Sequence, residues 1–108
     1  MDSYNNGMRE LSVGAVSAIT AGSYFYQPSR RLGGYHYVVR YPNGYGASII
    51  KNLGSYGGEW NLWEVAVLRQ EEDGTWHLCY DTEITDDVLG GLSEADVVDA
   101  CRRICTLV

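Results

Sequence analysis

The chain of 108 residues has one Phe, two Pro and three Cys, and no apolar run long enough to span a bilayer. Its first ten residues, MDSYNNGMRE, lack the basic and apolar stretches of a secretory signal. Three cysteines are an odd number, and their spacing does not match a disulfide framework. We therefore expect a cytoplasmic protein with reduced thiols and no membrane segment.

Charge is unevenly divided along the chain, whose net charge is −6. Residues 1–58 carry five cations and two acids, whereas residues 59–108 carry three cations and twelve acids, so the halves have net charges of +3 and −9. The acidic second half argues against a general nucleic-acid binder, because phosphate contacts need cations.

Residues 35–108 predict an α+β fold, in which a four-stranded antiparallel β-meander carries a C-terminal α-helix packed on one face. Four segments are rich in β-branched and aromatic residues, and Asn43-Gly44 and Asp73-Gly74 favour tight turns. The third segment is apolar on both faces, which predicts a central strand. The predicted strands are residues 35–41, 45–51, 62–70 and 75–81.

Residues 1–34 are weakly patterned, and we assign them to the same single domain. The apolar stretch 11–19 is compatible with a short helix or an edge strand. The segment 21–34 reads as a strand fragment followed by a loop.

Two helical segments are predicted after residue 84. Thr85 is a candidate cap for a single turn over residues 86–89, which Gly90-Gly91 would end. Ser93 and Asp96 have the spacing of a capping box. The apolar stripe that predicts the C-terminal helix consists of Val97, Cys101, Ile104 and Val108.

Seven carboxylates lie between Leu78 and Ala100. Four of them fall in the predicted first turns of helices, where negative charge is stabilised; these are Asp86, Asp87, Glu94 and Asp96. Helix starts do not account for Asp81 and Glu83. A calcium loop does not account for them either, because the run from Asp81 lacks the central glycine and the final glutamate.

The predicted positions of four candidate ligands are compatible with a zinc site. Two candidate ligands share one face of a predicted strand and two share one face of a predicted helix, so all four could meet where the helix covers the sheet. The four are His77, Cys79, Cys101 and Cys105. Buried free cysteines more commonly pack as small hydrophobes, so we expect metal-free thiols and no cofactor.

Two alternatives to protein binding stay open. No G-x-S-x-G, P-loop or G-x-G-x-x-G motif is present, but a small thiol- or metal-dependent enzyme using Cys79 is compatible with the sequence. A single-stranded nucleic-acid binder is compatible as well, because cations interleaved with aromatic side chains can stack bases. The cations of that set are Arg30, Arg31, Arg40 and Lys51, and its tyrosines are Tyr24, Tyr26, Tyr35, Tyr37, Tyr41 and Tyr45.

Several motifs between Tyr35 and Ala100 resemble a group of small proteins encoded by bacteriophages and prophages. The motifs are N-G-Y-G-x-S-I from Asn43, S-Y-G from Ser55, L-W-E-x-A-V-L from Leu62 and L-C-Y-D-T-x-I-T-D-D-V from Leu78. The resemblance implies a phage setting. By analogy, small acidic phage proteins without catalytic motifs inhibit host machinery, as anti-CRISPR and other anti-defence proteins do.

We therefore predict a non-enzymatic phage protein that binds and inhibits a host protein, such as a CRISPR or other defence nuclease complex. The acids would face a basic surface that normally holds nucleic acid, and nearby aromatic side chains would anchor the contact. The predicted partner-binding residues are Glu83, Asp86, Asp87, Asp81, Glu59, Tyr56, Trp60 and Tyr80. Exposed aromatics and an open sheet edge also allow a homodimer.

Overall fold

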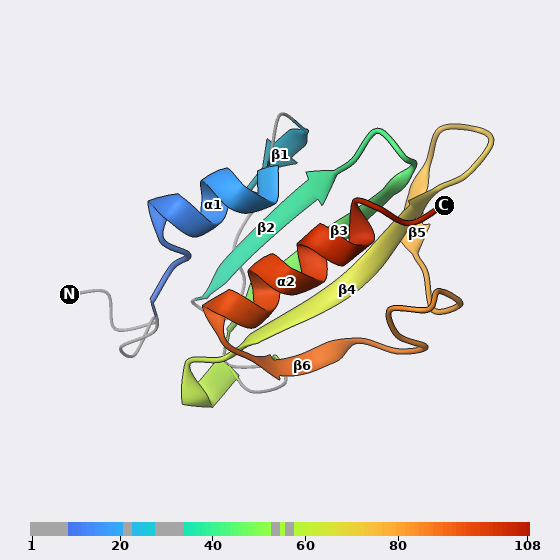
Figure 1. Ribbon diagram of the computed structural model, residues 1–108. Coiled ribbons are helices and arrows are strands. Elements are labelled where there is room, and N and C mark those ends of the chain that lie inside the picture. The colour runs from blue at the N-terminus through green and yellow to red at the C-terminus, as the bar shows by residue number, and fades with distance from the viewer. Residues whose placement is uncertain (1–8, 21–22, 28–33, 53–54, 56–57) are drawn as a thin grey trace.

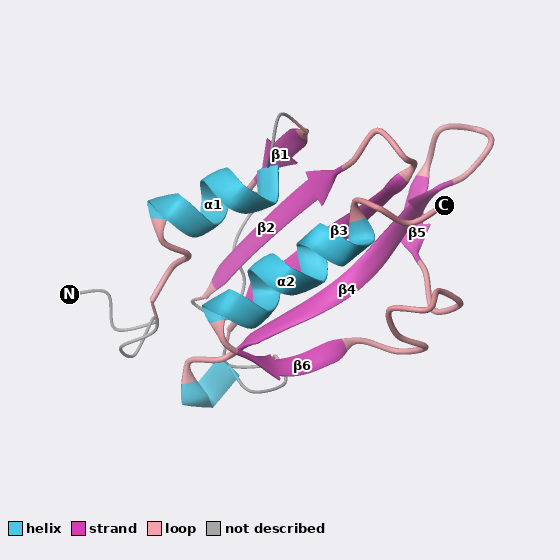
Figure 2. Cartoon of the chain, in the orientation of Figure 1, coloured by secondary structure: helices cyan, strands magenta, loops and turns pink. Residues whose placement is uncertain are grey.

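The computed structural model describes residues 9–20, 23–27, 34–52, 55 and 58–108. An antiparallel sheet forms one layer and two helices lie on one of its faces, which confirms the predicted α+β class (Figure 1, Figure 2). The elements are α1 (Val13–Thr20), β1 (Tyr24–Tyr26), β2 (Tyr35–Arg40), β3 (Tyr45–Lys51), the 3₁₀ helix η1 (Gly58–Trp60), β4 (Trp63–Gln70), β5 (Trp76–Leu78), β6 (Leu89–Leu92) and α2 (Glu94–Ile104).

The sheet has six strands, two more than the four predicted. Strands β1 to β5 follow one another in chain order, and β6 also pairs with β4. β5 pairs with the last residues of β4, Leu68 to Gln70, while β6 pairs with its first residues, from Trp63 to Val65. The two short strands therefore share one edge of β4, and the connection between them runs beside that strand (Figure 1).

The helical turn predicted for residues 86–89 is wrong. Leu89 begins β6, whose pairing with β4 satisfies backbone groups that a single helical turn would leave unpaired. Thr85 still accepts a backbone hydrogen bond, from the N–H of Asp87 at 3.1 Å, but it shapes a turn instead of capping a helix. Asp86 and Asp87 consequently gain no stabilisation from a helix dipole.

The N-terminal segment joins the fold through α1 and β1. The helical alternative for residues 11–19 is confirmed over Val13–Thr20, and Ser12 caps it by accepting from the N–H of Ala15 at 3.1 Å. Ala15 and Ile19 are buried against the sheet. The hydroxyl of Tyr41, on the sheet side, donates to the carbonyl of Ile19 at 2.7 Å.

The C-terminal helix matches its prediction closely. Ser93 and Asp96 form both hydrogen bonds of a capping box. The predicted stripe is buried at Val97, Cys101 and Ile104, but α2 ends at Ile104, so Val108 is exposed and Leu107 packs in its place. No helix among the described residues is both long enough and apolar enough to cross a membrane.

The two faces of the sheet differ in what covers them. The face toward the helices carries the buried core, which includes Val39, Ile49, Val65 and Val67. The alternate residues of each strand point to the other face, and neither α1 nor α2 covers that face (Figure 1). We call it the uncovered face with respect to these two helices.

Candidate functional site

The acidic connection, residues 79–88, joins β5 to β6 and carries four of the predicted partner-binding acids. Glu83, Asp86 and Asp87 are exposed, as expected. In the described part of the chain, none of these three belongs to an ion pair. Their charges are therefore not neutralised by ion pairs with the cations that the structure describes.

The shape of the acidic connection comes from residues other than its acids. The Thr82 hydroxyl accepts from the N–H of Ile84 at 3.2 Å, and the Thr85 hydroxyl accepts from the N–H of Asp87 at 3.1 Å. Ile84 packs partly against the core. The two threonine turns and this apolar anchor hold the backbone, and among the described residues no hydrogen bond or ion pair involves the carboxylates of Glu83, Asp86 and Asp87.

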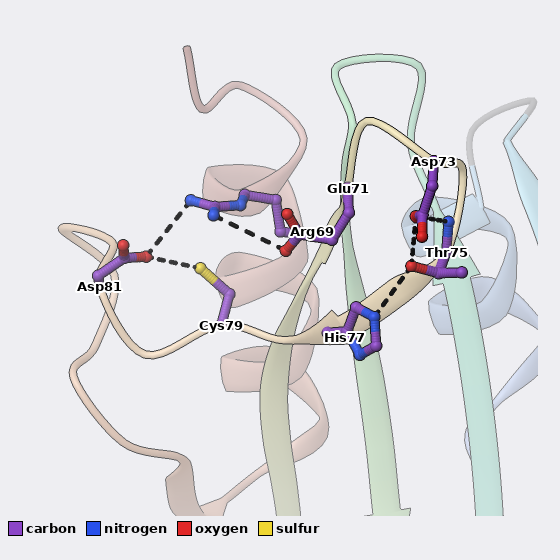
Figure 3. A network of polar contacts seen from close by, with 7 residues as sticks. All are labelled: Arg69, Glu71, Asp73, Thr75, His77, Cys79 and Asp81. Atoms are coloured by element: carbon purple, nitrogen blue, oxygen red, sulfur yellow. Dashed lines mark hydrogen bonds and ion pairs between the residues drawn. The ribbon is translucent and has the colours of Figure 1, made fainter.

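Asp81 differs from the other three acids because it is tied to the sheet (Figure 3). The Cys79 thiol donates to its carboxylate at 2.9 Å, and Arg69 forms an ion pair with it at 3.7 Å. These two contacts, the thiol first, lower the pKa of Asp81. Arg69 also lies 3.8 Å from Glu71, so one guanidinium serves two carboxylates.

One exposed aromatic side chain lies within the acidic connection and another lies just before β4. Tyr80 lies inside the connection and is 46% exposed, whereas Trp60 lies in η1, just before β4, and is 71% exposed. Tyr56 lies outside the described residues, and so does the side chain of Glu59. Of the eight predicted partner-binding residues, Tyr80, Asp81, Glu83, Asp86 and Asp87 lie on the acidic connection, whereas Trp60 lies in η1.

The four residues of the predicted zinc set do not converge. Among the described residues, which include all four, there is no group of three His, Cys, Asp or Glu side chains that could hold a metal. His77 instead lies 2.9 Å from the Thr75 hydroxyl, and Cys79 donates to Asp81. Helix and strand periodicity placed each pair on one face but gave no information on the separation between the pairs.

The surroundings of Cys79 and Cys101 do not favour the thiolate form. Burial raises the pKa of Cys79, and its hydrogen bond to Asp81 raises it further. Burial raises the pKa of Cys101 to about 12. A nucleophilic thiol needs the opposite shift, which a nearby cation or a helix N-terminus would supply.

A chain of polar contacts runs from Asp73 through Thr75 to His77 on the β4–β5 hairpin (Figure 3). The Thr75 hydroxyl lies 2.6 Å from the Asp73 carboxylate and 2.9 Å from the His77 ring. All three residues are exposed. In a nucleophilic triad the histidine stands between the acid and the hydroxyl, whereas here the hydroxyl is in the middle, so the order is that of a turn motif.

An aromatic–cation cluster on the uncovered face was only partly visible in the sequence. The guanidinium carbon of Arg40 lies 5.6 Å from the ring centre of Tyr24, 5.4 Å from that of Tyr26 and 5.2 Å from that of Trp76. Gly46 stands opposite Arg40 on β3, and the Trp76 ring lies beside it, 3.4 Å from where a Cβ of residue 46 would stand. The sequence pattern indicated Arg40 and the two tyrosines but gave no signal for Trp76, which only strand pairing brings near.

A pocket beside Lys51 was missed altogether. It has a volume of about 640 Å³ and lies between the segment before α1, the end of β3, the start of β4 and the start of α2. Lys51 is the one buried charged residue among those described, with 3% exposure. The strand's alternation places Lys51 on the same face as Ile49, and this was the available signal.

Comparison with family models, with curated proteins and with solved structures found no match to this chain. The assignment of a role therefore depends on the geometry described above.

Proposed function

We propose that this protein acts without catalysis, by binding a host protein through the acidic connection and inhibiting it. The partner is a protein with a basic surface of the kind that holds nucleic acid, such as a defence nuclease complex met in the host cytoplasm during phage infection. The proposal rests on one observation. Glu83, Asp86 and Asp87 are exposed on one connection, and none of them forms an ion pair with a cation that the structure describes.

The energetics of this placement support a binding role. Three like charges on one short connection repel one another, which gives no gain to folding. Against a basic surface the same charges raise the association rate and select the partner. Tyr80, half exposed beside them, is of the residue type that anchors protein interfaces.

The test is affinity capture from a bacterial host lysate, with the wild type and the double variant Glu83→Lys with Asp87→Lys as baits. We expect a protein captured by the wild type to be lost with the variant. A single-stranded oligonucleotide should displace the captured protein, since it competes for the same basic surface. Capture should also weaken as salt rises.

The control is Glu72→Lys with Asp99→Lys, which changes the net charge equally at exposed positions outside the acidic connection and gives up one exposed ion pair, Asp99 with Arg102. Capture should survive in this control. If both double variants lose capture alike, net charge is responsible and the acidic connection is not the interface. If neither loses it, the interface lies elsewhere on the molecule.

The Arg40 cluster favours a second candidate function, the stacking of single-stranded nucleic acid on the uncovered face. Tyr24 is 60% exposed and lies beside a cation on an open sheet, which is how sheet proteins hold unpaired bases. Its test is a fluorescence titration with an oligonucleotide at physiological salt, comparing the wild type with Tyr24→Ala. Tight, salt-sensitive binding that the variant loses would rank this candidate first. We expect no tight binding, because the second half of the chain repels phosphate.

A further inference from the structure

Lys51 is the only lysine in the chain, and the fold buries it at the end of β3. A buried lysine loses the hydration of its ammonium, so it persists where other groups compensate. Its Nζ donates to the carbonyl of Arg9 at 2.9 Å and to Oδ1 of Asn61 at 2.6 Å. It also lies 4.1 Å from the ring centre of Trp63, within range of a cation–π contact.

The surroundings of Lys51 form a pocket between two helix starts, lined by both polar and apolar side chains. Ser12, which caps α1, and Ser93, which caps α2, both line it. Glu94 joins the two helices across the pocket, since its carboxylate accepts from the N–H of Ser12 at 2.6 Å and from the Ser12 hydroxyl at 3.1 Å. Asn61 reaches Lys51 from a left-handed backbone conformation, with φ of 63°, that non-glycine residues adopt uncommonly.

The charges around the pocket favour neither an anionic nor a cationic ligand. Glu10 and Glu94 line it together with Arg9 and Lys51, so the two signs are balanced. Burial, and secondarily Arg9, lowers the pKa of Lys51 to about 8, while Glu94 opposes the shift. A measurable share of the amine is therefore uncharged near neutral pH, and an uncharged amine is a nucleophile toward carbonyl carbon.

We propose that this pocket binds a small polar aldehyde, which Lys51 holds as a reversible imine. The amine lone pair of Lys51 attacks the carbonyl carbon, and the proton leaving nitrogen goes to the carbonyl oxygen. Solvent protonates the resulting hydroxyl, which departs as water, and a protonated imine remains. The cation of that imine takes the place of the ammonium between Asn61 and the Trp63 ring, and the polar residues of the lining, Ser93 and Glu94 among them, surround the substituents.

The test uses the folded chain, glyceraldehyde as the probe and cyanoborohydride to trap imines, with peptide mapping by mass spectrometry. The chain has two primary amines, Lys51 and its own terminal amine. An exposed terminal amine has a pKa of about 8, close to that of Lys51, so basicity alone predicts equal labelling. We expect Lys51 to be labelled at least about tenfold faster, because a pocket that positions the aldehyde raises its effective concentration.

Two variants of α1 separate pocket binding from general reactivity. Val13 is exposed and lines the pocket, so Val13→Trp should obstruct it and slow the labelling of Lys51 to the rate of the terminal amine or below. Ala18, exposed on the same helix but outside the pocket lining, gives the control Ala18→Trp, in which labelling should match the wild type. Labelling of the terminal amine alone would overturn the proposal. Labelling of Lys51 seen only in denaturant would overturn it too, because Lys51 would then be a structural tie that holds Arg9 and Asn61 to the sheet.

Discussion

The charge of Lys51 is buried, whereas the charges of Glu83, Asp86 and Asp87 on the acidic connection are exposed. Lys51 is buried, with two oxygen acceptors and an aromatic ring around its ammonium. Glu83, Asp86 and Asp87 are exposed and belong to no ion pair among the described residues. A buried polar group whose partners are removed costs far more than an exposed one, so the two regions should respond very differently to substitution.

The largest expected effect comes from Lys51→Ala. This change removes a buried side chain and leaves the acceptors at Arg9 and Asn61 short of a donor, which should cost about 2–4 kcal/mol of the free energy of unfolding. In a domain of this size that lowers Tm by about 10–20 °C in a thermal melt followed by circular dichroism. The control Arg103→Ala, an exposed cation in the last turn of α2, should change Tm little. An equal decrease in Tm in both variants would show that the contacts of Lys51 do not stabilise the fold more than those of an exposed cation.

An intermediate effect is expected for Glu94→Ala. Its carboxylate bonds both the backbone N–H and the hydroxyl of Ser12, and thereby ties the start of α1 to the start of α2. Losing this charge-assisted pair should cost about 1–2 kcal/mol, measured by urea denaturation. Glu94→Gln keeps an acceptor and should recover part of the loss. A Glu94→Ala variant as stable as the wild type would mean that α1 docks through its apolar residues alone.

The free energy of unfolding should depend on pH in part through the ionisation of Lys51. Its folded pKa, about 8, lies below the ordinary 10.5, so the unfolded chain binds more protons between these values and stability rises with pH across them. Burial raises the pKa of Cys101 and Tyr41, which lowers stability at high pH in any variant. The measurement is therefore the free energy of unfolding of the wild type minus that of Lys51→Met, by urea denaturation from pH 7 to 10. We expect this difference in the free energy of unfolding to become more favourable to the wild type as pH rises. A difference that does not change with pH would contradict the lowered pKa of the buried Lys51.

The smallest effect on folding should come from Glu83→Lys with Asp87→Lys. Both side chains are exposed and outside every ion pair of the described residues, so Tm should stay within about 4 °C of the wild type. Circular dichroism melts at low salt and at physiological salt check this. A collapse of stability would mean that the acids serve the fold and would remove the main support for an interface.

Local chemistry made the regular parts of the fold predictable. Turn residues at Asn43-Gly44 and Asp73-Gly74 marked the hairpins, and both glycines have the positive φ that such turns require. The capping box at Ser93 and Asp96 marked the start of α2. The exposure of the acids also followed from the sequence, because neighbouring like charges on a short connection cannot be buried together.

Long-range pairing decided what local pattern could not. The local sequence of residues 86–89 favours a capped helical turn, yet Leu89 pairs with Val65. Pairing with the open edge of β4 outweighs this weak local preference. The four zinc candidates satisfied face periodicity but do not converge, since periodicity gives direction and no distance.

Composition and local pattern by themselves determined the class of the fold, the α2 helix with its cap, the hairpin turns and the acidic surface. Only the tertiary structure decided that Arg40 meets Trp76 and that Lys51 meets Asn61 and Trp63. The physical reason is the same in both cases. A turn or a cap is stabilised by residues within one another's reach along the chain, whereas the surroundings of a strand residue are set by the partner strands and helices, whose register depends on the packing of the whole core.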